Sequence, residues 1–196
     1  MSPILQSRAN ASAIGYGAFS VAAAAGDFES IATVTVGSGG AANIEFTSIP
    51  ATYAHLQLRG IARSDRAQTQ DFWRIQFNSD TGSNYSNHLL YGDGSSAIAS
   101  AEANATYAAV FYSSAASTTA SVFSGSVFDV LDYANTNKYK TLRGLSGMDY
   151  NGTGRIQFWS GNWRNTNAIT SLKLTSDNSA NFAQYSHFAL YGIKAA

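Results

Sequence analysis

Hydrophobic and polar residues alternate with a period of two along most of the chain after residue 30. In YAHLQLRGIAR (residues 53–63), for example, Leu56 and Leu58 lie on the face opposite to His55 and Gln57. This is the pattern of a half-buried antiparallel strand. The other segments with strand character are residues 31–36, 44–46, 71–78, 105–112, 120–133, 139–148, 154–163, 168–175 and 184–193.

Connections rich in Gly, Asn, Ser and Asp separate these segments, among them NSDTGSN, GDGSS, ANTNK, YNGTG and SDNSAN. Such residues favour turns, and strands that follow one another without helices between them predict an all-β fold. We expect an antiparallel β-sandwich of the jelly-roll type over residues 30–196. The pattern IATVTV, GSGG, NIEF (residues 31–46) predicts a hairpin, whereas residues 97–107 have no clear period and are left unassigned.

Residues 1–29 contain small apolar residues without a sustained period. A segment that cannot bury a face of its own is either a flexible tail or an arm that docks on a neighbour. Larger apolar side chains at four positions favour an extended N-terminal docking arm, because a monomer leaves them in water. These candidate docking residues are Ile14, Tyr16, Phe19 and Val21.

The composition argues against several kinds of partner. Lys and Arg together number 12, as do Asp and Glu, so the chain is neutral and has no basic run for nucleic acid or an anionic membrane. No stretch approaches the ~20 apolar residues of a membrane helix, and the N-terminus lacks the pattern of a secretory signal. Cysteine is absent, which removes disulfides and thiolate metal sites. We therefore expect neither nucleic-acid binding nor membrane insertion.

Two octets are similar: YSNHLLYG (residues 85–92) and YSHFALYG (residues 185–192) share Tyr, Ser, Leu, Tyr and Gly at the same offsets, and YAHLQLRG fits the same frame more loosely. The three histidines, His55, His88 and His187, all lie in these segments. His88, however, lies on the face opposite to the tyrosines of its octet, whereas a metal site needs imidazoles that converge. We therefore interpret the frame as a packing pattern, and we expect no metal, no cofactor and a fold unchanged by chelators.

Known catalytic motifs are missing from the sequence, which contains no G-x-S-x-G elbow, HExxH, Walker loop or G-x-G-x-x-G. Asp129 and Asp132 are three positions apart on a predicted strand and point to opposite faces, which does not suit an acid–base pair. Other aspartates fall in turns, where a carboxylate commonly caps local backbone. We predict that the protein is not an enzyme.

The aromatic residues of RIQFWSGNW provide a stronger functional signal. Alternation predicts that Ile156 and Phe158 face the core and that the two tryptophans lie on the polar face. Exposed tryptophans indicate an interface or a platform on which a sugar ring stacks, and core packing at a sheet edge explains them equally well. The candidate interface or glycan-stacking residues are Arg155, Gln157, Trp159 and Trp163.

The chain also contains FTSIPATYAHLQLRGIAR, GSNYSNHLLYGDGSS, VFDVLDYANTNKYKTLRGLSG and AQYSHFALYGIKA. In this combination the segments resemble small virion structural proteins of tailed bacteriophages, which are of the tail, fibre or capsid-associated type. The resemblance covers roughly residues 44 to 196 and implies a non-enzymatic, sheet-rich particle component present in multiple copies. It transfers no active-site residue, and the N-terminal arm lies largely outside it.

Two functions are consistent with these observations. The first is a structural protein of the virion that decorates the capsid or forms part of the tail or fibre, attached to other virion proteins by its arm. Outward aromatic residues predict a closed homo-oligomer, with a trimer as the preferred form. The second is a carbohydrate-binding module of the virion that recognises a host surface glycan, for which a jelly roll with exposed tryptophans is a suitable scaffold.

Overall fold

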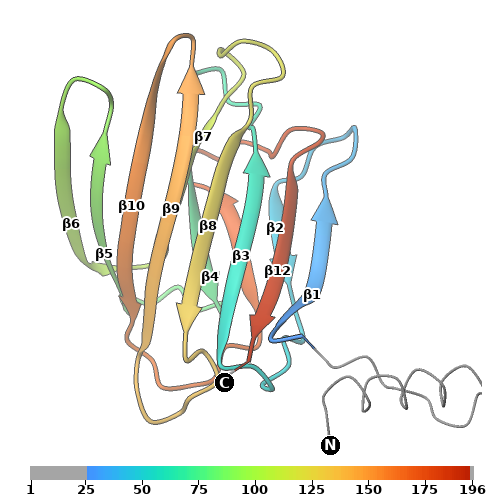
Figure 1. The fold of residues 1–196 in the computed structure, drawn as a ribbon, viewed down its shortest axis with the longest axis vertical. Coiled ribbons are helices and arrows are strands. Elements are labelled where there is room, and N and C mark those ends of the chain that lie inside the picture. Colours follow the sequence, from blue (N-terminus) through green and yellow to red (C-terminus); the bar gives the residue numbers. More distant parts are fainter. Residues whose placement is uncertain (1–25, 195–196) are drawn as a thin grey trace, which may run out of the picture.

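The computed structural model describes residues 26–194, which contain twelve β-strands in two antiparallel sheets (Figure 1). The larger sheet has eight strands, in the spatial order β1 (Phe28–Thr35), β12 (His187–Ile193), β3 (His55–Ala62), β8 (Ser124–Leu131), β9 (Lys140–Tyr150), β10 (Thr153–Trp163), β5 (Tyr85–Gly92) and β6 (Ala97–Ala105). The smaller sheet has four, in the order β2 (Asn43–Phe46), β11 (Leu172–Ser176), β4 (Gln70–Phe77) and β7 (Ala108–Ser114). The predicted all-β sandwich is confirmed. No helix in this part of the chain is long and apolar enough to cross a membrane.

Eight of the twelve strands form a jelly roll. The first strand pairs with the last, β1 with β12, and the following pairs lie one inside the other: β2 with β11, β3 with β8, and β4 with β7. Successive pairs alternate between the larger and the smaller sheet. This nested winding is the topology of a jelly roll, as the sequence predicted.

The other four strands form two hairpins that widen the larger sheet. Strands β9 and β10 are joined by Asn151 and Gly152, whose φ angles of 61° and 85° are those of a type I′ turn. Strand β10 also pairs with β5, and β5 pairs with β6. The larger sheet therefore continues past β8 through β9, β10, β5 and β6, and we call these four strands the extension (Figure 1).

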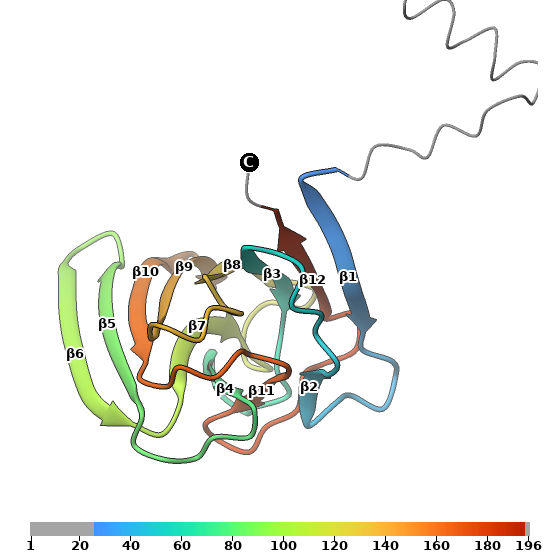
Figure 2. The ribbon, with the colours of Figure 1, turned by 90° about the horizontal axis from the view of Figure 1, so that it is seen from below.

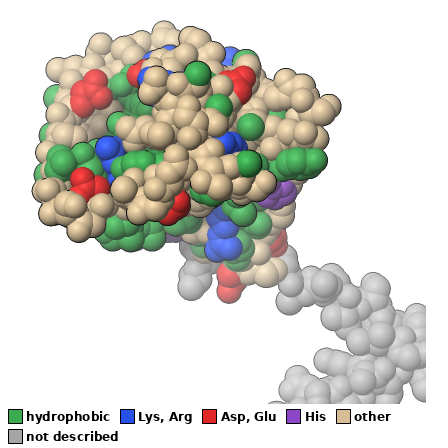
Figure 3. All heavy atoms as spheres, turned by 90° about the horizontal axis from the view of Figure 1, so that it is seen from above, with side chains coloured by type: hydrophobic (Ala, Val, Ile, Leu, Met, Phe, Trp, Pro, Cys, Tyr) green, Lys and Arg blue, Asp and Glu red, His purple; other side chains and the backbone are tan. Residues whose placement is uncertain are grey.

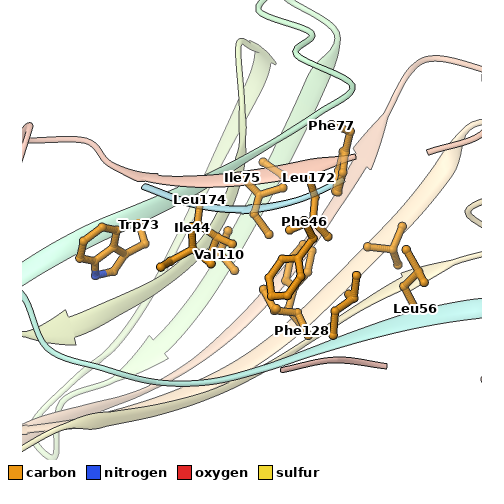
Figure 4. Packing of buried hydrophobic residues seen from close by; sticks show 14 of the residues in the cluster. Ile44, Phe46, Leu56, Trp73, Ile75, Phe77, Val110, Phe128, Leu172 and Leu174 are labelled. Atoms are coloured by element: carbon orange, nitrogen blue, oxygen red, sulfur yellow. The ribbon is translucent and has the colours of Figure 1, made fainter. Parts of the chain in front are cut away.

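The hydrophobic core lies between the two sheets (Figure 4). Strand β4 alternates as predicted, so that Trp73, Ile75 and Phe77 are fully buried. Trp73 stacks on Phe182 with ring centroids 3.4 Å apart, and Phe182 contacts the edge of Phe188 at 4.8 Å. Aromatic residues thus fill much of the space between the sheets.

One local prediction is wrong, one segment left unassigned is a strand, and the first strand begins slightly earlier than expected. Strands β1 and β2 do not form a hairpin, because β1 pairs with β12 in one sheet and β2 with β11 in the other. Residues 97–107, left unassigned, contain β6. The sandwich begins before residue 30, since Phe28 and Glu29 pair with Ile193 and Gly192.

Candidate functional site

Strand β10 lies with its faces opposite to the prediction. Trp159 and Trp163 point inward with 7% and 0% of their surface exposed, and Gln157 is also fully buried. Ile156 and Phe158, assigned to the core by alternation, are 53% and 52% exposed on the outer face of the larger sheet. The prediction of an exposed tryptophan pair is therefore wrong. Both faces of this strand carry large apolar residues, so alternation could not decide which face is buried.

Apolar side chains form a continuous row on the outer face of the larger sheet. Phe158 lies between Leu90 on β5 and Leu145 on β9, and Leu145 lies opposite Val127 on β8. Residues directly opposite in antiparallel strands share a face, with Cβ atoms about 4.5–5.5 Å apart. The surface formed by this row and two neighbouring isoleucines is called here the apolar outer face. It consists of Ile61, Leu90, Val127, Leu145, Ile156 and Phe158.

Two glycines flatten the middle of the apolar outer face. Gly125 on β8 lies opposite Gly147 on β9, and Ile61 and Ile156 flank this pair. A Cβ added to Gly125 meets no atom within 4 Å, so a side chain there projects into open space. The glycines and Ile156 border a shallow depression of about 300 Å³.

Charged side chains beside the apolar outer face are engaged with neighbours. Asp129 accepts hydrogen bonds from Arg143 Nε and Gln57 Nε2, both at 2.8 Å. The Arg59 guanidinium lies over the ring of Tyr191, 5.6 Å from its centroid. Figure 3 shows another side of the molecule, where Lys, Arg, Asp and Glu side chains form small separate groups among hydrophobic and uncharged polar atoms.

A cleft lies on the inner side of the extension. The smaller sheet ends at β7, whereas the larger sheet continues to β5 and β6, which pass beyond it (Figure 2). Residues 97–104 of β6 are exposed on both faces of the strand. The cleft has a volume of about 280 Å³, and we call it the aromatic cleft. Its principal lining residues are Phe72, Glu102, Tyr107, Tyr112, Trp159 and Asp177.

Four aromatic rings from β4, β7, β10 and the segment before β7 meet in this cleft. The Phe72 ring lies 5.0 Å from Tyr112, 5.8 Å from Trp159 and 6.1 Å from Tyr107, measured between centroids. These separations are typical of attractive aromatic pairs. Trp159 is nearly covered, but the other three rings are only half-buried. The cleft therefore offers aromatic surface to a ligand.

Two arginines stack on tyrosine rings at the cleft. The Arg155 guanidinium lies 4.6 Å from the ring centroid of Tyr91 and 5.4 Å from that of Tyr112. Arg74 lies 5.2 Å from the ring centroid of Tyr107. Burial raises the pKa of the Tyr112 hydroxyl, and the positive charge of Arg155 offsets part of that rise. The hydroxyl stays protonated at neutral pH and can donate a hydrogen bond.

Carboxylates and an amide complete the polar groups. Asp177 pairs with Arg74 at 3.0 Å. Asn87 Nδ2 donates to Glu102 Oε2 at 3.4 Å and to the Tyr107 carbonyl at 3.0 Å, which links the extension to the start of β7. Burial raises the pKa of the Tyr107 hydroxyl, and the negative charges of Glu102 and Asp177 raise it further.

Three of the four candidate residues predicted in β10 lie beside this cleft. Trp159 lines it, Arg155 stacks on Tyr112, and Gln157 Oε1 accepts hydrogen bonds from the Tyr112 backbone at 3.3 Å and Trp159 Nε1 at 3.4 Å. Arg155 Nε and Gln157 Nε2 are buried donors without a partner among residues 26–194. The fourth residue, Trp163, belongs to the core.

All three histidines lie on the outer face of the larger sheet, so the prediction that they occupy different faces is wrong. They are nevertheless far apart: three strands separate His88 on β5 from His55 on β3, or about 19 Å, and His187 lies at the opposite end of the neighbouring strand. His55 Nδ1 accepts a hydrogen bond from the Asp132 backbone at 3.0 Å, and His187 Nδ1 lies 2.9 Å from Thr35 Oγ1. Within the described range, no group of three or more His, Asp or Glu residues could hold a metal ion.

The repeated octets place their tyrosines on different faces. In β5, Tyr85 is buried in the core and Tyr91 also lies on the inner face, under Arg155. In the second octet, Tyr185 precedes β12 and is 70% exposed, and Tyr191 lies on the outer face, stacked on Phe28. Similar sequence therefore does not give similar packing in these two strands.

The candidate docking residues of the arm, Ile14, Tyr16, Phe19 and Val21, lie outside the described residues. Comparison of the chain with family models, curated protein sequences and solved structures finds no match.

Sequence reasoning missed both the apolar outer face and most of the aromatic cleft. A signal for the first was present, because large apolar residues in 154–163 occupy both alternating sets of positions, with Ile156 and Phe158 in one set and Trp159 and Trp163 in the other. Nothing comparable marked the cleft. Its rings come from segments that are distant in sequence, and only the packing of the extension beside β7 brings Phe72, Tyr107 and Trp159 together.

Proposed function

We propose that this chain is a non-enzymatic structural protein of a bacteriophage virion, which assembles as a closed homo-oligomer and contributes to the capsid surface, the tail or a fibre. The apolar outer face carries the proposal, because it supplies a contact through which copies associate. The resemblance of residues 44–196 to phage virion proteins supports a location in the virion.

The apolar outer face is more extensive than the scattered exposed residues of an ordinary monomer. Its residues lie on five adjacent strands, β3, β8, β9, β10 and β5, which together span about 19 Å. Standard protein interfaces cover about 800 Å² on each partner and have an apolar centre with a polar rim. The apolar outer face resembles such a centre, and Gln57, Asp129 and Arg143 form part of its rim.

Charge favours a second copy of the chain as the occupant. The formal net charge is zero, and Asp129 and Arg143 already pair with each other, so two like surfaces meet without repulsion. Copies that share one type of contact assemble into closed symmetric rings when the rotation between them closes. We expect a trimer.

A charge introduced at the middle of the apolar outer face tests this contact. Gly125→Glu should convert the oligomer to a monomer while the fold stays intact, because a side chain there projects into open space. Phe158→Glu should act in the same direction. Gly39→Glu is the matched control, since a Cβ at Gly39 also meets no atom within 4 Å but lies in the β1–β2 connection.

Light scattering gives the mass of each species, and circular dichroism reports whether each variant is folded. A wild-type chain that remains a monodisperse monomer at high micromolar concentration contradicts the proposed assembly. So does an oligomer that survives both charged substitutions.

Mass spectrometry and immunogold labelling of purified particles test the virion setting. The protein should occur in multiple copies per particle and at one defined position. Its absence from intact particles of the parent phage contradicts the proposal.

A further inference from the structure

The aromatic cleft is open because the extension is wider than the smaller sheet. Its outer wall is β6, whose residues 97–104 are exposed, so no segment in the described part of the chain covers that wall. Its inner wall is formed by β4 and β7. A ligand can therefore enter without any rearrangement of the sandwich.

The rings in the cleft suit a ligand that has a flat apolar side. Phe72, Tyr107 and Tyr112 are half-buried and keep part of each ring accessible. Their mutual contacts hold them at fixed positions, with Phe72 5.0 Å from Tyr112 and 6.1 Å from Tyr107. A sugar ring presents a face of C–H groups that packs on such aromatic surface, while its hydroxyl groups point sideways to polar partners.

Polar groups beside the rings suit hydroxyl groups. The carboxylates of Glu102 and Asp177 line the cleft and accept hydrogen bonds, and the tyrosine hydroxyls can both donate and accept. Asn87 and Ser100 also line the cleft and add an amide and a hydroxyl to these groups. Several hydrogen-bonding groups thus converge around the aromatic surface.

Arg74 and Arg155 lie beside the cleft but are not among its lining residues, so the cleft presents no arginine fork to an anion. Arg74 pairs with Asp177 at 3.0 Å and stacks on Tyr107. Arg155 lies over the ring of Tyr112. A phosphate or sulfate usually needs an arginine fork whose charge is not already compensated, and Glu102 adds a negative charge that repels anions. The cleft therefore favours an uncharged ligand.

From this combination we infer that the aromatic cleft binds a saccharide made of neutral sugar residues. The volume of about 280 Å³ limits the enclosed part to a monosaccharide or disaccharide unit, and the open end allows a longer chain to continue outside. The inference does not depend on the proposed assembly, because the aromatic cleft and the apolar outer face lie on opposite sides of the larger sheet.

Saturation-transfer NMR on the full-length chain tests the inference with a defined set of probes. The probes are the methyl glycosides of glucose, galactose, mannose, rhamnose, N-acetylglucosamine and N-acetylgalactosamine, together with their common disaccharides, at millimolar concentration. At least one probe should receive saturation from the protein, most strongly at protons on one face of the ring.

Two cleft variants and two matched controls place the bound sugar. Tyr107→Ala should weaken binding about tenfold, because it removes stacking surface, and Glu102→Gln should weaken it severalfold by altering a hydroxyl acceptor. Tyr139→Ala and Glu45→Gln change exposed residues of the same types outside the cleft and should leave binding unchanged. Melting curves of Glu102→Gln should match those of the wild type, since this side chain is exposed.

The NMR results with the wild type and the variants decide whether the cleft binds a sugar. Lack of saturation transfer to every probe, or equal binding by the wild type and both cleft variants, overturns the inference. Binding that is lost in the cleft variants but retained in Gly125→Glu supports it, whether or not the chain proves to be an oligomer.

Discussion

The two halves of the larger sheet place similar residues in different surroundings. In the jelly-roll half, β1, β12, β3 and β8 face the smaller sheet, and inward residues such as Leu56, Phe128 and Phe188 are buried. In the extension, inward residues of β5 such as Leu89 and Tyr91 are only half-buried. One continuous sheet therefore serves as a core wall from β1 to β10 and becomes accessible from its inner side only at β6 and part of β5.

The extension itself is divided along the length of its strands. At one end, Tyr85, Leu142 and Trp163 join the hydrophobic core. In the middle of β10, Trp159 borders the aromatic cleft, and Phe158 lies on the apolar outer face. The core contacts anchor the extension, so the two surfaces are held in place by the rigid sandwich rather than by mobile loops.

The largest expected effect separates core aromatic residues from cleft aromatic residues on the same strand. Trp73→Ala should lower the free energy of unfolding by about 3–5 kcal/mol, because it leaves a cavity beside Phe182 and Ser113 without its hydrogen bond from the indole. Phe72→Ala, one residue away on the opposite face, should lower it by less than about 2 kcal/mol. Urea denaturation measures both values. Equal decreases in the free energy of unfolding for the two variants contradict the distinction between the buried core aromatic residues and the partly exposed residues of the aromatic cleft.

Features that depend on local sequence, such as strand β4 and the turn between β9 and β10, could be predicted, whereas the way the strands pack against one another could not. Strand β4 was predicted correctly because only one of its faces is uniformly apolar, with Trp73, Ile75 and Phe77. The turn between β9 and β10 also follows from local chemistry, since an Asn-Gly pair accepts the positive φ angles of a type I′ turn.

The orientation of β10 could not be predicted in the same way. Ile156 and Phe158 on one face are as apolar as Trp159 and Trp163 on the other, so the burial of one set depends on where the smaller sheet lies. The false hairpin of β1 and β2 has a related cause. In a jelly roll, consecutive strands cross between sheets and pair with strands from the other end of the chain.

A smaller effect is expected at Asp80, which lies in the connection between β4 and β5 and binds the side chain of Trp163 at the end of β10. Trp163 Nε1 donates to Asp80 Oδ2 at 2.7 Å, and Asn84 Nδ2 and the Gly82 backbone also donate to this carboxylate. Burial by itself raises the pKa of Asp80, but these hydrogen bonds together hold it below the usual value of 3.8.

The sign of the pH dependence follows from this lowered pKa. The ionised carboxylate stabilises the fold fully above the unfolded-state pKa, and this contribution is lost as the pH falls through the lower folded-state pKa. Asp80→Asn should cost about 1 kcal/mol at neutral pH and should make the free energy of unfolding less sensitive to acid. Urea denaturation at a series of pH values checks this. Parallel loss of stability in the variant and the wild type on acidification contradicts it.

The smallest expected effect tests whether the edge of the extension is open. Ile98 on β6 is 40% exposed, whereas Ile75 on β4 is fully buried. Ile75→Ala should cost about 2–5 kcal/mol, because it leaves a cavity between the sheets. Ile98→Ala should change the free energy of unfolding by less than about 0.5 kcal/mol, and amide protons of β6 should exchange faster than those of β3 and β8. A cost above about 1 kcal/mol for Ile98→Ala shows that another surface covers β6 in solution. In that case β6 is not exposed in solution, and the extension does not differ from the jelly roll at this edge. A partner that covers β6 would also close the entrance to the aromatic cleft.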